Sequence, residues 1–149
     1  MPTEEKFISF EVYNAFGDYY TYSNHNALAL ITSLDELKVL CGAKNYPVYQ
    51  EDKLGYDSAL SEKIRRYDES YFLNHALVLY FFTESRGNTT IQIDDMSVQD
   101  ASLYLHASRT FGSAATAEIV TYSFLIEVVR QDVAGVVEVR TKVNAQFVD

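Results

Sequence analysis

A run of seven apolar residues at positions 76–82 most constrains what this chain can fold into. An amphipathic strand alternates apolar and polar side chains, whereas this run is apolar on both faces. Its length and its strand-forming residues fit a strand better than a helix. The sequence therefore predicts a central strand with both faces covered. One face carries Leu77, Leu79 and Phe81, and the other carries Ala76, Val78, Tyr80 and Phe82.

The residues just before this run predict a short helical turn. Asp68 suits the N-cap position, where a carboxylate accepts hydrogen bonds from the first N–H groups of a helix. Tyr71 and Phe72 follow it. Burying each of these rings stabilises a fold by about 1.5–3 kcal/mol. We therefore expect both rings to close one end of the core.

Two longer helices are expected earlier in the chain. Ser33 and Glu36 form a capping-box pattern at the start of the first helix. Gly42 is expected to end it in a left-handed cap. The second helix is expected over residues 57–67, where apolar residues recur at the helical period. The apolar face of the first helix is expected to hold Leu34, Leu37, Leu40 and Cys41.

Alternating apolar and polar residues predict the other strands, with turn residues between them. A bulge is expected near Asp94 and Asp95, where the alternation breaks. Glu127 is expected on the polar face of a long strand late in the chain. Residues 84–88 are expected to form a hairpin turn after the central strand. The strands are expected at 7–13, 19–23, 27–32, 89–98, 101–109, 116–130 and 136–143.

The order of these elements predicts the fold class. Strands come first and two helices follow, and after the central strand four consecutive strands complete the chain. The expected fold is one α+β domain over residues 1–149. It is expected to be an antiparallel β-barrel or sandwich of about six or seven strands, with two short helices inserted before the central strand.

Composition narrows the classes of partner. The formal net charge is −9, which disfavours generic nucleic-acid binding and docking to an anionic membrane. The chain has 12 Tyr and 9 Phe but no Trp. A high tyrosine content is typical of half-exposed sheets and also of binding surfaces. A protein partner is therefore favoured over a nucleic acid.

The sequence contains no pattern that indicates catalysis or metal binding. The single cysteine, Cys41, allows no internal disulfide and no cysteine-based zinc site. His25, His75 and His106 lack the spacing of metal ligands. Phosphate-binding loops and nucleophile motifs are absent as well. We therefore expect no catalytic residues, no cofactor and no metal.

The sequence is compatible with two cellular compartments. No signal peptide and no apolar run of about 20 residues, the length that spans a bilayer, is found in the chain as written. A cytoplasmic protein is the expectation from the chain as it stands. The alternative is an exported protein whose signal or anchor segment is absent from this sequence.

Two segments are candidates for binding a partner, because exposed loops carried by a rigid sheet often do so. The first is an irregular, tyrosine-rich segment that contains Tyr46, Tyr49 and Tyr56. The second is the tip of the expected hairpin, formed by Ser85, Arg86, Gly87 and Asn88.

Three stretches in the middle of the chain carry a resemblance. Residues 67–72 read Y-D-E-S-Y-F, residues 76–79 read A-L-V-L, and residues 85–88 read S-R-G-N. This layout resembles a group of small bacterial α+β domains over roughly residues 28–143. Over roughly residues 76–143 it is also similar to the C-terminal domain of PrcB-type proteins. The second resemblance implies a β-rich fold and a role in protease regulation.

Three functional readings follow. The first is a non-enzymatic protein-interaction domain that presents residues 85–88 to a protein partner, such as a protease or an envelope protein. The second is a small-molecule-binding barrel or an enzyme with a Tyr-lined mouth, close to Asp94, Asp95 or His106. The third is a homo-oligomer that pairs edge strands at 19–23 or at 136–143.

Overall fold

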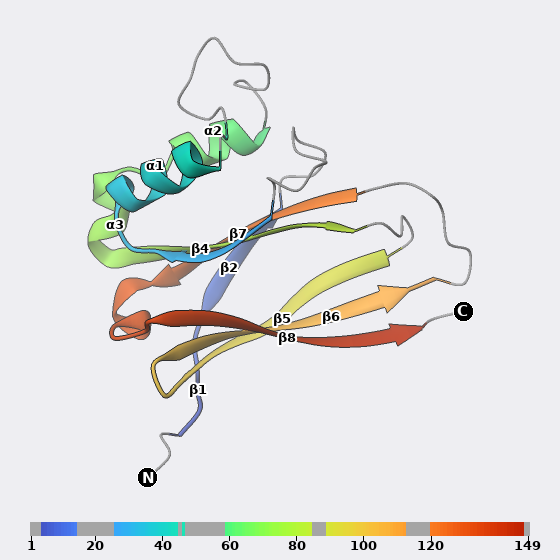
Figure 1. Cartoon of the computed structure of the whole chain (residues 1–149). Coiled ribbons are helices and arrows are strands. Elements are labelled where there is room, and N and C mark those ends of the chain that lie inside the picture. The colour runs from blue at the N-terminus through green and yellow to red at the C-terminus, as the bar shows by residue number, and fades with distance from the viewer. Residues whose placement is uncertain are drawn as a thin grey trace.

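The fold has three layers: helices, a first β-sheet and a second β-sheet (Figure 1). The residues that the computed structural model describes are 4–14, 26–44, 46, 59–84, 89–112 and 120–147. Among them, eight strands form two four-stranded sheets, and neither sheet closes on itself. The chain is therefore an α+β sandwich, and the alternative of a barrel is wrong.

The sheet next to the helices, which we call the helix-covered sheet, is antiparallel throughout. Its central member, β4, pairs with β3 on one side and with β7 on the other. The central strand expected from the apolar run is therefore confirmed. In spatial order the strands are β2 (Phe10–Asn14), β7 (Val120–Val129), β4 (His75–Glu84) and β3 (Ala27–Ile31).

The other sheet, which we call the second sheet, has one parallel pair. Its order is β1 (Lys6–Phe7), β5 (Thr89–Gln99), β6 (Ser102–Phe111) and β8 (Glu138–Phe147). β8 runs parallel to β6. The chain passes through β7 in the other sheet and a 3-10 turn, η3 (Arg130–Val133), before it reaches β8. The expectation of an all-antiparallel fold is therefore wrong for this pair, since the crossover lets β8 run in the same direction as β6.

Three helices, rather than two, cover the first sheet: α1 (Leu34–Ala43), α2 (Ala59–Arg65) and α3 (Glu69–Asn74). Both predicted N-caps are confirmed. Ser33 Oγ accepts the Glu36 N–H at 3.1 Å, and Asp68 Oδ1 accepts the Tyr71 N–H at 2.9 Å. Within the described part of the chain, no helix has the length and apolar character needed to cross a membrane.

The end of α1 differs from the expectation. The helix passes Gly42 and ends at Ala43, with Lys44 in a right-handed conformation at φ −89°. The Lys44 N–H still donates to the Leu40 carbonyl at 3.0 Å. The helical hydrogen-bond pattern thus continues to the cap, so no left-handed glycine is required.

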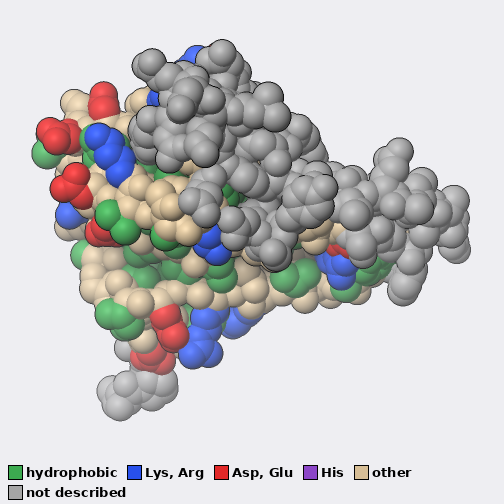
Figure 2. Space-filling model, turned by 45° about the horizontal axis from the view of Figure 1, so that its top comes forward, with side chains coloured by type: hydrophobic (Ala, Val, Ile, Leu, Met, Phe, Trp, Pro, Cys, Tyr) green, Lys and Arg blue, Asp and Glu red, His purple; other side chains and the backbone are tan. Residues whose placement is uncertain are grey.

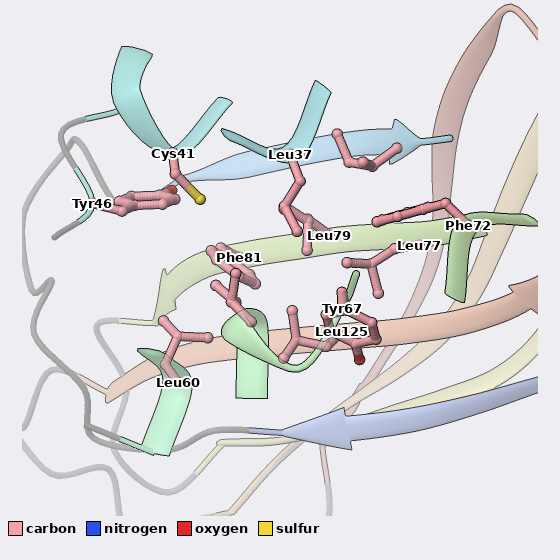
Figure 3. Close-up of a cluster of buried hydrophobic side chains, with 12 residues drawn as sticks. Leu37, Cys41, Tyr46, Leu60, Tyr67, Phe72, Leu77, Leu79, Phe81 and Leu125 are labelled. Carbon is pink, nitrogen blue, oxygen red and sulfur yellow. The ribbon is translucent and has the colours of Figure 1, made fainter. Parts of the chain in front are cut away.

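Two cores lie on the two faces of β4. On the helix side, Leu77, Leu79 and Phe81 are at most 1% exposed, and they point toward side chains of α1 and α2 (Figure 3). On the other side, Ala76 and Val78 are fully buried between the sheets. Both faces are covered, as the apolar run predicts.

The first predicted strand is divided between the two sheets. β1 pairs with β5 in the second sheet, whereas β2 pairs with β7 in the helix-covered sheet. Ile8, between them, donates its N–H to the Met96 carbonyl at 3.0 Å. Alternation continues across the change of sheet, so the sequence pattern alone reads as one strand.

The hairpin expected at 84–88 is also wrong. β4 and β5 lie in different sheets and do not pair. The intervening residues 85–88 lie outside the described structure. The turn after β5 is a hairpin: Asp100 and Ala101 have φ values of 51° and 66°, the left-handed conformation of a type I′ loop. The predicted bulge is confirmed between Ile93 and Asp95.

Candidate functional site

Most residues expected to bind a partner lie outside the described structure, namely Tyr49, Tyr56, Ser85, Arg86, Gly87 and Asn88. Tyr46 is described, and it is only 2% exposed. Its N–H donates to the Cys41 carbonyl at 2.8 Å, and its ring centroid lies 5.9 Å from that of Phe81. Tyr46 is therefore a core residue and not part of a recognition surface.

A pair of carboxylates lies at the edge of the helical layer. Glu11 on β2 and Glu127 on β7 are direct cross-strand partners. Both point to the helix side, because the two residues that flank each of them in the chain pack between the sheets. Like charges at directly opposite positions destabilise a sheet. This pair is therefore a candidate for binding rather than for stability.

One cation lies over this pair. Lys63 of α2 places its Nζ 3.1 Å from Glu127 Oε2 and 3.7 Å from the centre of the Tyr13 ring. The Tyr67 hydroxyl donates to the same Glu127 oxygen at 2.7 Å. Among the described residues, no cationic side chain forms an ion pair with Glu11. The cluster therefore carries more negative than positive formal charge.

A hollow of about 310 Å³ opens beside the two carboxylates, and we call it the carboxylate pocket. One wall is His75, which stacks on Tyr71 with ring centroids 5.1 Å apart. The Tyr71 hydroxyl donates to the Ala76 carbonyl at 2.8 Å, which fixes the ring. The lining residues are Ser9, Phe10, Glu11, His75, Glu127, Val128 and Val129.

The two carboxylates contribute to raised pKa values in three tyrosines near the pocket. Burial, and then the hydrogen bond and charge of Glu127, raise the pKa of Tyr67. Burial, followed by the charges of Glu127 and Glu11, raises the pKa of Tyr71. The pKa of the exposed Tyr13 is raised chiefly by Glu127 and then by Glu11. A negative field of this kind favours a positively charged ligand.

The raised pKa of Tyr67 predicts a loss of stability at alkaline pH. Above pH about 10, a tyrosine of the unfolded chain releases its proton, whereas folded Tyr67 keeps it. The unfolding free energy should therefore fall as pH rises. In Tyr67→Phe this fall should be shallower, which urea titrations at several pH values would measure. A Tyr104→Phe control that flattens the curve equally would contradict the assignment.

A larger hollow, of about 650 Å³, adjoins the carboxylate pocket through Val129. Its walls include Leu73, which is 73% exposed, and Val129, which is 44% exposed. Its cation, Arg130, donates from Nη1 to the Thr32 carbonyl at 3.1 Å and to the Phe72 carbonyl at 2.6 Å. Leu73 and Val129 give this hollow exposed apolar surface, whereas the two carboxylates lie at the smaller pocket. Figure 2 shows acidic, basic and hydrophobic side chains close together at the margin of the helical layer.

A serine, a histidine and a glutamate meet on the outer face of the second sheet, but not as a catalytic triad. Ser97 Oγ lies 2.8 Å from His106 Nε2 and donates to Glu5 Oε2 at 3.2 Å. In a triad the acid holds the other ring nitrogen of the histidine. Here Glu5 approaches Nε2 itself, at 4.0 Å, and Ser97 is fully buried. The arrangement fixes β1 to the sheet.

A further hollow of about 320 Å³, the inter-sheet hollow, lies where β4 ends. Arg109 on β6 donates from both Nε, at 2.8 Å, and Nη2 to Glu84 Oε2 on β4, so this ion pair joins the sheets. The ring centroids of Tyr80 and Phe82 lie 4.6 Å apart in its wall. Burial raises the pKa of Tyr80, and the Arg109 charge opposes that rise. The hollow is lined by Tyr80, Phe82, Thr83, Glu84, Ile91, Ala107, Arg109 and Val143.

The polar residues that the sequence placed near a Tyr-lined mouth do not line this hollow. Asp94 accepts a hydrogen bond from Ser108, and Asp95 lies opposite His106 next to the bulge. No group of three or more His, Cys, Asp or Glu side chains suited to a metal ion occurs in the part of the chain that the structure describes.

Glu11 and Glu127 were not recognised as a site from the sequence. They are far apart in the chain, and each reads as a polar residue on an exposed strand face. Only the pairing of β2 with β7 brings them together.

Comparisons with known proteins identify no relative of this chain. No family model, no curated protein and no solved structure matches it.

Proposed function

We propose that this domain is a non-enzymatic protein-interaction module that takes a basic side chain of its partner into the carboxylate pocket. The observation that carries the proposal is the direct opposition of Glu11 and Glu127, with one nearby lysine for two carboxylates. A sheet tolerates such repulsion at a cost, and a bound cation would relieve it. Binding sites often retain unfavourable interactions of this kind, although these interactions lower the stability of the fold.

Lys63 supports the choice of a cation. Its ammonium group already lies between Glu127 and the Tyr13 ring, at 3.1 Å and 3.7 Å. A carboxylate together with an aromatic face is a favourable setting for an ammonium or guanidinium group. Glu11, beside it, supplies the second carboxylate for an incoming cation.

The apolar surface next to the pocket supports a protein as the partner. A segment with apolar side chains would cover Leu73 and Val129 while its basic residue reaches Glu11. Such a contact combines a partly apolar centre with charges at its rim. The resemblance to PrcB-type domains supports a protease, or another protein of the cell envelope, as the partner.

Selection from a random peptide library on phage tests this proposal without knowing the partner. The immobilised wild-type domain should enrich peptides with Lys or Arg next to apolar residues. Glu11→Gln should bind the selected peptides about tenfold more weakly, because one charge-assisted contact is lost. The same substitution should stabilise the free domain, because it removes the repulsion across β2 and β7.

Glu62→Gln is the matched control, since it removes the same charge from an exposed position of α2. Peptide binding to this variant should equal that of the wild type. Enrichment of peptides without basic residues would refute the proposal. Equal loss of binding in Glu11→Gln and Glu62→Gln would assign the attraction to the overall charge of −9 instead.

The second candidate function is the binding of a small molecule in the inter-sheet hollow. The observation that favours it is the aromatic wall of Tyr80 and Phe82 next to the partly buried Glu84–Arg109 pair. Apolar walls with a few convergent polar groups are typical of ligand pockets. A compound that raises the melting temperature of the wild type and of Glu11→Gln, but not of Arg109→Met, would favour this function.

A further inference from the structure

The outer edge of β8 has no strand partner in the described structure. β8 is the last strand of its sheet and pairs with β6 along one side only. It is ten residues long, and most of its side chains are exposed. Figure 1 shows it as the outermost strand beside β6. An unpaired edge of this length is a template for pairing with another strand.

Alternate residues of β8 direct their backbone groups at this edge. Gln99 and Ser102 close the two-residue β5–β6 hairpin, so Ser102 directs its N–H and C=O at β5. Leu103, the next residue, directs its groups at β8, where it lies opposite Val139. In a parallel ladder one residue of each opposite pair bonds across it. Val139 and Thr141 therefore present their backbone groups to the outer edge.

One antiparallel register between two copies of β8 satisfies these groups. With the two-fold axis at Arg140, Val139 of one copy lies opposite Thr141 of the other, and their backbone groups meet. Val137 precedes β8, and its N–H donates to the Ala101 carbonyl at 2.9 Å, so only its side chain, which is 85% exposed, takes part in the contact. In this register that side chain lies opposite Val143 of the partner copy, which is 47% exposed. Both valines are thus covered by each other in the same register.

The charges match in this register too. Glu138 lies opposite Lys142 of the partner copy, and symmetry repeats the pair. Lys142 Nζ lies 4.5 Å from the Tyr104 ring, but it forms no ion pair within the described residues. Arg140 meets its own copy, and its Nε is already 3.0 Å from Glu138 Oε1 within each chain. That pairing moderates the repulsion at the axis.

The neighbouring registers match less well. An axis at Thr141 places Arg140 opposite Lys142 twice, which opposes like charges. An axis at Val139 places Val143 opposite Gly135, so the exposed valine gains no apolar partner. Charge and apolar surface therefore select the same register.

We propose that two copies of this chain associate through their β8 strands, antiparallel and with the two-fold axis at Arg140. The pair forms one continuous eight-stranded sheet from the two second sheets. The interface is a single strand edge, so the dimer forms in a concentration-dependent equilibrium. It leaves the carboxylate pocket, which lies on the helix-covered sheet, open in both copies.

Cysteine cross-linking tests the register directly. Arg140→Cys puts the same residue of both copies at the axis, where Cα atoms of opposite residues are about 4.5 Å apart, within disulfide range. Mild oxidation should give a disulfide-linked dimer. The native Cys41 does not compete, because it is 1% exposed and burial raises its pKa to about 12.

Two further variants provide matched controls. Glu138→Cys and Lys142→Cys should each fail to cross-link alone but should cross-link when mixed, because these positions lie opposite each other. Self-cross-linking of Glu138→Cys at the rate of Arg140→Cys would overturn the register. Failure of folded Arg140→Cys to cross-link at any concentration would overturn the dimer.

Light scattering on the unmodified chain gives an independent readout. The mean mass should rise toward that of a dimer with concentration. Lys142→Glu opposes two like charges across the interface and should raise the dissociation constant about tenfold. A strictly monomeric wild type would overturn the proposal and would leave the peptide-binding proposal untouched.

Discussion

Replacing Phe81 by alanine is expected to lower the free energy of unfolding by about 3–5 kcal/mol. Phe81 is 1% exposed and lies at the centre of the core between β4 and the helices (Figure 3). Its ring packs against Tyr46, and truncation would leave a cavity between them. Since a typical domain is stable by about 5–15 kcal/mol, this one change removes a large part of the total.

Urea denaturation followed by circular dichroism would measure the effect. Val39→Ala in α1 is the control, because Val39 is 71% exposed and its truncation opens no cavity. The control should change stability by no more than about 0.5 kcal/mol. A loss below about 1 kcal/mol for Phe81→Ala would mean that this core does not hold the fold.

Replacing Arg109 by methionine is expected to cost about 3 kcal/mol, toward the lower end for a broken buried ion pair. The Glu84 side chain is 5% exposed and would lose its guanidinium partner, while Arg109 itself is 36% exposed and partly screened by water. The pair also joins β4 to β6, so the two sheets would be held together less firmly at this end.

The double variant Glu84→Met, Arg109→Met separates charge from packing. It removes the Glu84 carboxylate together with the guanidinium, so most of the stability lost in Arg109→Met should return. Thermal denaturation of the wild type, both single variants and the double variant gives the coupling energy between the two side chains. A double variant less stable than Arg109→Met would show that the pair contributes chiefly through packing.

Local signals in the sequence predicted the individual elements well. The apolar run at 76–82 identified β4 and its two covered faces, because a strand exposed on one side would need polar residues there. Ser33 and Asp68 identified two helix starts, because capping depends on the backbone within a few residues. The bulge at Asp95 was visible for the same reason, since it interrupts the alternation.

Which strands share a sheet was harder to predict from the sequence. Residues 84–88 look like a hairpin turn, and turn residues are equally suited to a loop that crosses between sheets. β4 already has β3 and β7 as neighbours, so the following strand has no free side to join in that sheet. The parallel pairing of β8 with β6 likewise depends on the crossover through β7 and η3.

The carboxylate pocket likewise has residues that the sequence describes locally and a pairing that only the tertiary structure creates. Glu11 and Glu127 each read correctly as polar residues on a strand face, but nothing near either residue in the chain indicates the other. The pair exists because β2 and β7 align them in register and because α2 brings Lys63 over them.

The sequence by itself thus determined most of the strands and helices and the covering of both faces of β4, and its charge of −9 disfavours nucleic acids and anionic membranes as partners. Hydrophobic period, capping and turn chemistry act over a few residues, so they can be read in the chain. Only the tertiary structure decided which strands pair, which carboxylates meet and which edge stays open. Those contacts join residues far apart in the chain, and they are selected by the packing of both faces of β4 at once.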